Sequence, residues 1–238
     1  MEEVYERMIA AYQPSERARV LLGETAMVLM VGVSGAGRDT IINHLVAKGG
    51  YYPLVTSTTR QPRVNNGVAE QNGVEYWFVN EEQAKQRMEA GEYVEVSPVH
   101  DRINGLLLDE LQRAHDTGKI AITDMDPQGA LKYHELSDNV IAIFVLPPSY
   151  EEWMSRNRLR YASEEAFAEA WPRRRESAIM ELEMAMRDPF YHFVINDELA
   201  HAIEACDTVA HGQSLDLESQ QKGRMLASAI LDQLRADD

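Results

Sequence analysis

The chain has 238 residues, of which 45% are hydrophobic, and a formal net charge of −16. This length and apolar content suit one large domain or two small ones with a sizeable core, and exclude wholesale disorder. The negative charge disfavours nonspecific binding to nucleic acid or to anionic membranes, because both reward positive charge.

The compartment is predicted from what the sequence lacks. A single cysteine, Cys206, excludes an internal disulfide and suits a reducing environment. The N-terminus lacks the basic and apolar pattern of a secretion signal, and no apolar run approaches the roughly 20 residues that span a bilayer. We therefore expect a cytoplasmic protein with no nucleic-acid partner and no membrane partner.

The first 25 residues are predicted to form a helical extension. Residues 2–12 are amphipathic, with Val4, Met8 and Ala11 on one face. Pro14 then ends this helix, and Ser15 is placed to cap a second one.

From residue 26 onward, short apolar runs alternate with helical patterns. This alternation predicts an α/β fold with a parallel sheet and helices on both faces, with ligands at the carboxyl ends of the strands. Within it, residues 56–106 have shorter alternating runs, which predict a small inserted subdomain with antiparallel strands. Capping boxes are predicted at Asn80 with Gln83 and at Ser149 with Glu152. The predicted strands cover residues 27–31, 54–57, 74–79, 93–97, 120–124, 140–145 and 193–195.

A glycine-rich loop, GVSGAGRDT at residues 32–40, follows the first of these strands and precedes a predicted helix at 40–48. Glycines let the backbone approach a phosphate, and a helix N-terminus directs N–H donors at it. Arg38 and Asp39 stand where a strict phosphate-binding loop has Lys and Ser or Thr. A glycine-rich turn that binds no nucleotide is the alternative.

A second motif, TSTTRQPR at residues 56–63, places two arginines beside a cluster of hydroxyls. Guanidinium groups bind phosphate through paired hydrogen bonds, and hydroxyls complete the oxygen shell. The alternative is a solvated polar loop. Two separate phosphate sites are what phosphoryl transfer between two nucleotides requires.

Further polar residues follow along the chain. The Tyr76 hydroxyl is a candidate donor to a phosphate, and the Glu95 carboxylate is a candidate acceptor for the N–H groups of guanine. Asp124 ends a buried strand, the usual place for an aspartate that orients Mg²⁺. Arginines cluster at 156, 158, 160 and 173–175, which predicts either a solvated helix face or a mobile lid over a transferring phosphoryl group.

Together these motifs resemble the guanylate kinase family from about residue 28 to residue 205. The resemblance rests on SGAG (34–37), STTRQPR (57–63), EYWFV (75–79), DMDPQG (124–129) and VIND (194–197). It implies a P-loop kinase core at residues 26–56 and 107–205, a GMP-binding subdomain at 57–106 and a lid at about 154–175. Residues 1–25 and 206–238 are then terminal helical extensions.

The resemblance also implies a reaction, ATP + GMP → ADP + GDP with Mg²⁺, and roles for individual residues. The residues implied to bind ATP are Ser34, Gly35, Ala36, Gly37, Arg38, Asp39, Thr40 and Asn196. Those implied to bind GMP are Thr56, Arg60, Arg63, Tyr76, Glu95 and Asp126. Arg38, Asp124, Arg158 and Arg174 are the implied catalytic residues, and Asp39 and Asp124 the implied metal ligands.

The chain departs from the family pattern at five positions. Arg38 and Asp39 replace the loop Lys and Ser, Asn104 replaces a Tyr before Gly105, Leu106 replaces a hydroxyl residue after it, and Ala162 replaces a lid arginine. These departures leave open two alternatives to the kinase. One is a catalytically impaired module that binds a phosphorylated ligand in the GMP site, and the other is a kinase for another small phosphorylated acceptor.

The C-terminal tail is predicted to be helical from residue 223 to residue 234. Its apolar residues are Met225, Ala229, Leu231 and Leu234. Together with those of the N-terminal helix, they are expected either to pad the core or to form a homodimer.

Overall fold

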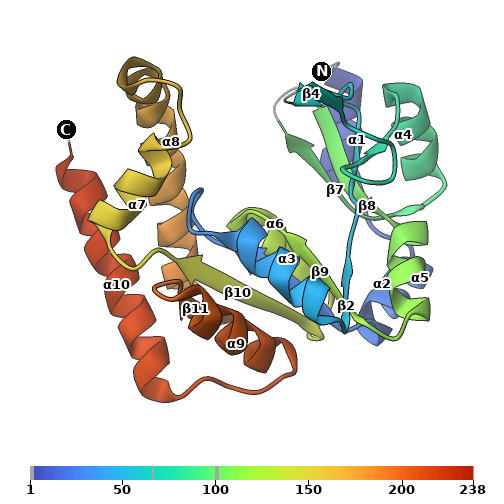
Figure 1. The fold of residues 1–238 in the computed structure, drawn as a ribbon. Coiled ribbons are helices and arrows are strands. Elements are labelled where there is room, and N and C mark those ends of the chain that lie inside the picture. The colour runs from blue at the N-terminus through green and yellow to red at the C-terminus, as the bar shows by residue number, and fades with distance from the viewer. Residues whose placement is uncertain (1–2, 66, 100–101, 238) are drawn as a thin grey trace. The chain divides into compact units, whose positions relative to one another are not determined.

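The computed structural model describes residues 3–65, 67–99 and 102–237, and Figure 1 shows the elements along the chain. The chain divides into two compact units, each assembled from segments that are distant in the sequence. Unit 1 comprises Met1–Met27, Tyr51–Thr123 and Lys132–Val140. Unit 2 comprises Val28–Gly50, Asp124–Leu131 and Ile141–Asp238.

Unit 2 is built on buried parallel strands with flanking helices. Its elements are β1 (Met27–Val31), α3 (Arg38–Lys48), β10 (Val140–Leu146), α7 (Tyr150–Arg158), α8 (Glu164–Arg187), β11 (Tyr191–Ile195), α9 (Leu199–Ala210) and α10 (Leu217–Ala236). Strands β11, β10 and β1 lie in that order, and Phe144 on β10 is opposite Phe193 on β11 in a parallel register. Every residue of β1 is buried, as its unbroken apolar sequence predicts.

Unit 1 contains a second, smaller sheet. Its elements are α1 (Glu3–Ala11), α2 (Glu16–Glu24), β2 (Tyr51–Pro53), β3 (Ser57–Thr58), β4 (Val64–Asn65), β5 (Val68–Ala69), β6 (Trp77–Phe78), α4 (Glu81–Glu89), β7 (Tyr93–Val99), β8 (Arg102–Leu107), α5 (Leu108–Asp116) and β9 (Ile120–Asp124). Helix α6 (Pro127–Leu136) has residues in both units. Strands β2 and β9 pair in parallel. The small sheet has the order β6-β3-β8-β7.

The predicted fold class, mixed α/β with parallel strands and flanking helices, is confirmed. The prediction that the inserted strands are antiparallel is only partly right. Strand β8 is antiparallel to β3 and to β7, but β6 joins β3 in parallel.

Two predicted strands were wrong in extent. Residues 54–56 lie between β2 and β3, and residues 74–76 lead into the two-residue strand β6. The backbone explains the second case, because Gly73 N–H donates to the Tyr76 carbonyl (2.8 Å) and Val74 N–H donates to the Gln71 carbonyl (3.1 Å). These N–H groups are used in a turn, so they are not available to a strand ladder.

The predicted helix caps at Ser15, Asn80 and Ser149 are present, and the reciprocal capping box is seen at Asn80. Ser15 Oγ accepts from Ala18 N–H (3.3 Å), Ser149 Oγ accepts from Glu152 N–H (3.1 Å), and Asn80 with Gln83 forms a reciprocal capping box. Helix α10 begins at Leu217 rather than at residue 223, because Asp216 caps it by accepting from Ser219 N–H (2.8 Å).

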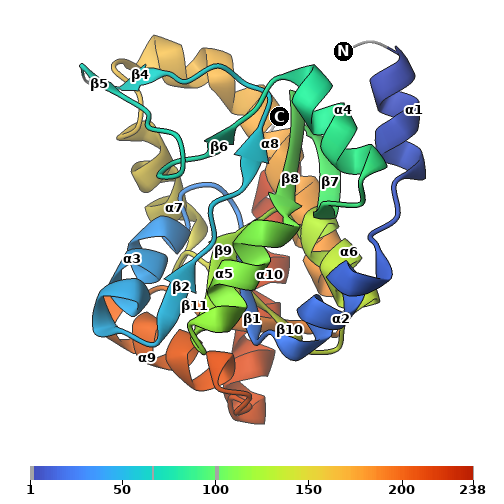
Figure 2. The ribbon, with the colours of Figure 1, turned by 90° about the vertical axis from the view of Figure 1, so that its right-hand side faces the viewer.

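Helix α1 packs against β7, as Figure 2 shows. Its buried face differs from the predicted one: Ile9 is buried, Met8 is half-buried and Ala11 is exposed, while the side chain of Val4 lies outside the described residues. Ile9 belongs to the core cluster of the small sheet. The Tyr12 hydroxyl donates to the Tyr93 carbonyl (2.6 Å), which fixes the end of the extension to β7.

Helix α10 packs against α8 and β11 in unit 2 (Figure 1). Of the predicted apolar face, Leu231 and Leu234 are buried, whereas Met225 and Ala229 are exposed. Gly223 lies so close to Phe193 that a Cβ at this position would be 2.6 Å from the Phe193 Cβ. The buried faces of both terminal helices therefore contribute to cores within the chain. Among the helices that the structure describes, none is long and apolar enough to cross a membrane.

Candidate active site

The glycine loop in unit 2 joins β1 to α3 in the predicted way. Gly32 has a φ of 141°, and a Cβ there would lie 2.3 Å from the Val145 carbonyl oxygen. Gly37 caps α3 in the left-handed region, with a φ of 98°. Helix α3 therefore begins at Arg38, two residues earlier than predicted. Both positions need glycine because a side chain would be strained and would clash.

Asn196, predicted to lie near adenine, holds this loop. Its Nδ2 donates to the Ala36 carbonyl (2.8 Å), and the residue is buried. A Cβ on Gly37 would meet the same Nδ2 at 2.3 Å. Asn196, which comes directly after β11, therefore fixes the conformation of the glycine loop.

The loop borders a cavity of about 440 Å³ within unit 2. Most of its lining is charged or polar. The lining residues are Ser34, Gly35, Gly37, Arg38, Asp39, Thr40, Asp124, Arg156 and Arg160. The fold thus brings the two predicted metal ligands, Asp39 and Asp124, to one cavity with three arginines.

The Arg38 guanidinium is anchored at one of its nitrogens. Nη1 donates to the carbonyl oxygen of Met125, the residue after β9, at 2.9 Å. The guanidinium has further N–H donors. A positive charge is therefore held beside the loop although the loop lacks lysine.

Ser34 in the loop contacts one arginine from the segment between α7 and α8 and one arginine from α8. Its Oγ accepts from Arg174 Nη1 (2.8 Å) and from Arg160 Nη1 (3.1 Å). Its carbonyl accepts from Trp153 Nε1 (2.8 Å). Sequence reasoning predicted Arg174 as a lid arginine but assigned no role to Trp153.

Arg158, the other predicted lid arginine, is placed differently. Its Nε donates to Glu164 (3.1 Å), its guanidinium lies over the Phe167 ring, and it is not among the residues that line the loop cavity. Arg156 and Arg160 of the same cluster do line it.

Glu181 on α8 is a residue that sequence reasoning missed. Its Oε2 is buried and has no hydrogen-bond partner among the described residues. The pKa of Glu181 is raised to about 7, mainly by burial; the charge of Arg38 opposes this shift and the charge of Asp126 adds to it. Glu181 lies seven residues after Arg174, which puts both on one face of the helix, and this spacing was the available signal.

Asp126, predicted to read the base, begins α6. Its Oδ1 accepts from Gly129 N–H (2.8 Å), as in a helix cap. The second oxygen of the carboxylate is available for other contacts.

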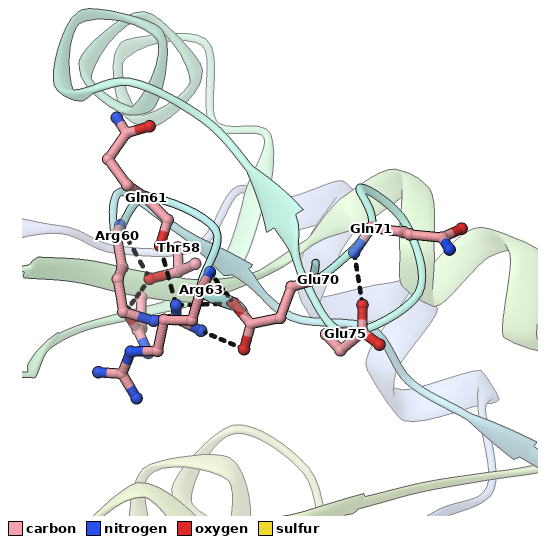
Figure 3. A network of polar contacts seen from close by, with 8 residues as sticks. Thr58, Arg60, Gln61, Arg63, Glu70, Gln71 and Glu75 are labelled. Atoms are coloured by element: carbon pink, nitrogen blue, oxygen red, sulfur yellow. Dashed lines mark hydrogen bonds and ion pairs between the residues drawn. The ribbon is translucent and has the colours of Figure 1, made fainter. Parts of the chain in front are cut away.

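The second predicted phosphate site lies in unit 1, and Figure 3 shows it. Glu70 accepts two hydrogen bonds from Arg60, from Nη1 at 2.7 Å and from Nη2 at 3.0 Å. Glu70 also accepts from Arg63 N–H at 2.8 Å. The Arg60 guanidinium and this N–H together lower the pKa of Glu70. Sequence reasoning missed Glu70. The hairpin of β4 and β5 brings residue 70 back beside residue 63.

Tyr76 belongs to the same site. The Arg60 guanidinium carbon is 5.2 Å from the centre of the Tyr76 ring and 5.7 Å from that of Phe78. The two aromatic rings therefore both contribute to holding the arginine in place. Thr56 lies just before β3, where its carbonyl accepts from Trp77 N–H (2.9 Å).

Glu95, predicted to read guanine, is buried on β7 and is paired. Lys132 Nζ lies 3.3 Å from Glu95 Oε1 and 3.0 Å from Ser97 Oγ. The Ser97 hydroxyl donates to the same carboxylate oxygen. Sequence reasoning assigned no role to Lys132.

The unusual residues Asn104 and Leu106 both lie on β8. The Thr58 hydroxyl donates to Asn104 Oδ1 (2.8 Å), and the Leu106 side chain is buried. Asn104 therefore links β8 to β3 through a side-chain hydrogen bond at the TSTTRQPR motif.

A glycine loop between a buried parallel strand and a helix, bordered by carboxylates and arginines, is typical of P-loop phosphate-binding proteins. Comparison with known proteins gives the family. The profile of the guanylate kinase family matches residues 24–213. The guanylate kinase of Thermotoga maritima is 29% identical over 195 residues, covering 82% of this chain and 90% of that protein. That of Caldanaerobacter subterraneus subsp. tengcongensis is 34% identical over 179 residues, covering 75% and 82%.

A solved structure supports the fold. The crystal structure of guanylate kinase from Anaplasma phagocytophilum is similar with a TM-score of 0.57 and 23% identity, covering 86% of this chain and 94% of that one. The chain belongs to the guanylate kinase family, whose enzymes are transferases that act as nucleotide kinases. Helices α1 and α10 lie outside the matched residues.

Proposed function

We propose that the chain transfers the terminal phosphoryl group of ATP to GMP, giving ADP and GDP. The observation that carries the proposal is that two separate sets of groups have the chemistry to bind phosphate. One is the glycine loop with the arginines around Ser34, and the other is Arg60 with Arg63 in TSTTRQPR. The names of the curated relatives support the choice of GMP as acceptor.

The proposed donor site is the loop cavity in unit 2. The backbone of residues 34–40 would surround the phosphates of ATP, because its glycines permit close approach and the N-terminus of α3 attracts negative charge. Arg38 would contact the terminal phosphates. Asn196 would act by keeping the loop in shape beside the adenine.

The proposed acceptor site is built on the TSTTRQPR motif and the small sheet of unit 1. Arg60, Arg63 and Tyr76 would hold the GMP phosphate, with Glu70 fixing the direction of the Arg60 guanidinium. Thr56, Glu95 and Asp126 would contact the base. The four-stranded sheet is then the core of the GMP-binding subdomain at 57–106, and the lid at 154–175 includes the end of α7 and the start of α8.

The loop cavity is suited to Mg²⁺. Two carboxylates, Asp39 and Asp124, and the Thr40 hydroxyl supply hard oxygen donors. The described residues contain no cluster of three or more acidic, His or Cys side chains that would enclose a metal by itself. Mg²⁺ usually takes one or two carboxylates together with substrate phosphates. When bound, the ion would neutralise charge on the phosphates.

The residues would act by positioning and by electrostatic stabilisation. The loop would hold the phosphates of ATP and Arg60 would hold the phosphate of GMP, because this kind of catalysis is mainly positioning. Arg38, Arg174 and Arg160 would stabilise charge that develops on the transferring group. Asp39 adds negative charge beside the donor phosphates, so catalysis depends on these arginines to balance it.

A coupled assay with ATP, Mg²⁺ and GMP tests the proposal, with calorimetric titrations of each nucleotide beside it. We expect turnover that needs both nucleotides. Folded protein that binds GMP but neither binds ATP nor turns over would point instead to the impaired binding module. Turnover with another phosphorylated acceptor but not with GMP would point to a different substrate.

A further inference from the structure

A row of polar side chains crosses one face of the small sheet in unit 1. Thr58 on β3 is opposite Asn104 on β8, and Asn104 is opposite Ser97 on β7. Residues opposite each other in a sheet point to the same face, and so do residues two apart on one strand. Glu95 therefore shares this face with Ser97. The row spans two strand spacings, which is about 10 Å.

The two ends of this row have different chemistry. At the β3 end, Arg60 N–H donates to Thr58 Oγ1 (3.2 Å), so this end adjoins the proposed phosphate site. At the β7 end, a hydrogen-bonded group is formed by the side chains of Glu95, Ser97 and Lys132. A nucleotide lying along the row with its phosphate at Arg60 would have its base at this group.

At the β7 end of the row, Lys132 adds a positive charge and N–H donors beside the carboxylate of Glu95. The ammonium has three N–H donors, and its contacts with Glu95 and Ser97 use two of them. The Lys132 side chain is 40% exposed, whereas that of Glu95 is 10% exposed. Both residues line a cavity of about 560 Å³ in unit 1. Leu106, opposite Glu95 on β8, offers no polar group to a ligand.

A carboxylate and an ammonium side by side match one edge of guanine. This edge has the O6 acceptor next to the N1–H and N2–H donors, whereas adenine has an amino donor at position 6. Glu95 can accept from the guanine N–H groups, and the remaining Lys132 donor can reach O6. The same ammonium would oppose the 6-amino group of adenine, because two donors would face each other.

We propose that Lys132 is a specificity-determining residue that reads the 6-oxo group of the acceptor base, together with Glu95. This inference rests on the proposed function, because it takes a purine monophosphate as the acceptor. It predicts a preference for 6-oxo purines, GMP and IMP, over the 6-amino purine AMP.

The test measures calorimetric affinity and kcat/KM for GMP, IMP and AMP in the wild type and in Lys132→Met. We expect the affinity for GMP and for IMP to fall at least 10-fold, the affinity for AMP to stay within about threefold, and kcat with GMP to change little. The matched control is Lys119→Met, an exposed lysine before β9. Equal losses for all three nucleotides, or no loss for GMP, would overturn the inference.

A second variant guards against misfolding. Lys132→Met removes the cation that pairs with the buried carboxylate of Glu95, which is destabilising. The double variant Glu95→Gln with Lys132→Met removes both charges, and we expect it to fold and to lose the preference for GMP over AMP. A double variant that kept the wild-type preference would contradict the inference.

Binding separates this inference from the proposed function. Wild type that binds GMP at least 10-fold better than AMP, loses this preference in Lys132→Met and yet shows no turnover would refute the kinase and support the role of Lys132. Wild type that turns over GMP with an unchanged preference in Lys132→Met would support the kinase and refute that role. Wild type that binds no purine monophosphate would refute both.

Discussion

Arg38 Nη1 donates a 2.9 Å hydrogen bond to the carbonyl oxygen of Met125, the residue that follows β9. This contact explains how the loop keeps a fixed cation without lysine. Lysine carries a compact charge on a flexible stem, whereas the planar guanidinium can be anchored at one nitrogen and still present others to a phosphate. We infer that Arg38 takes over the role of the loop lysine, so the loop has not lost its cation.

Replacement of Arg38 tests this interpretation. We expect Arg38→Ala to lower kcat about 100-fold or more, because a charge aimed at the transferring group is lost, and to leave the affinity for GMP nearly unchanged. Steady-state kinetics and GMP titration measure the two effects. Arg17→Ala, on the exposed side of α2, is the matched control. A rate within about threefold of wild type would show that Arg38 does not act on the phosphates.

Glu70 is expected to act through Arg60. Glu70→Gln weakens the paired hydrogen bonds that fix the guanidinium, so we expect the KM for GMP to rise about 10-fold with a smaller change in kcat. Glu75→Gln is the control, because Glu75 accepts from Gln71 N–H in the same segment but does not contact Arg60 (Figure 3). Equal effects of the two substitutions on KM would argue against the positioning role.

The arginines at Ser34 are expected to differ from Arg158. We expect Arg174→Ala and Arg160→Ala each to lower kcat at least about 100-fold, since arginines that stabilise phosphoryl transfer contribute on this scale or more. Arg158→Ala should have a smaller effect, because Arg158 pairs with Glu164. Single-turnover rates of the three variants measure this order. A larger loss in Arg158→Ala would mean that the lid rearranges when nucleotides bind.

The raised pKa of Glu181 predicts that the stability of the protein depends on pH. Its pKa is raised to about 7 in the folded state, so between about pH 4.5 and pH 7 the folded chain keeps a proton that the unfolded chain has lost. The free energy of unfolding should therefore fall as the pH rises through this window. We expect Glu181→Gln to stabilise the protein by about 1–3 kcal/mol at about pH 8, and much less at about pH 5.

Urea unfolding at the two pH values measures this difference, with Glu176→Gln on the exposed side of α8 as the control. The same gain from Glu181→Gln at both pH values would show that the carboxyl does not titrate in this window.

The sequence predicted those parts of the fold that depend on local pattern. The buried run of β1, the glycine loop, and the caps at Ser15 and Asn80 follow from neighbouring residues. The short strand β6 was overestimated, because an apolar run does not reveal that the N–H groups of Gly73 and Val74 are used in a turn.

Site residues were predictable where a motif carries them and not where the fold joins distant segments. Lys132 lies 37 residues from Glu95 in the sequence, and Trp153 lies 119 residues from Ser34. No local pattern links these pairs, since strand order and helix packing bring them together. Glu181 was missed because its spacing from Arg174 does not reveal that its carboxylate is buried near the charges of Arg38 and Asp126.

The most direct test of the proposed phosphoryl transfer is to follow radioactive phosphate from γ-labelled ATP in the presence of Mg²⁺ and GMP. We expect label to appear in GDP, in amounts equal to the ADP formed, and we expect Arg60→Ala to remove most of this transfer. Folded wild-type protein that binds both nucleotides but forms no labelled GDP at high enzyme concentration would contradict the proposed transfer.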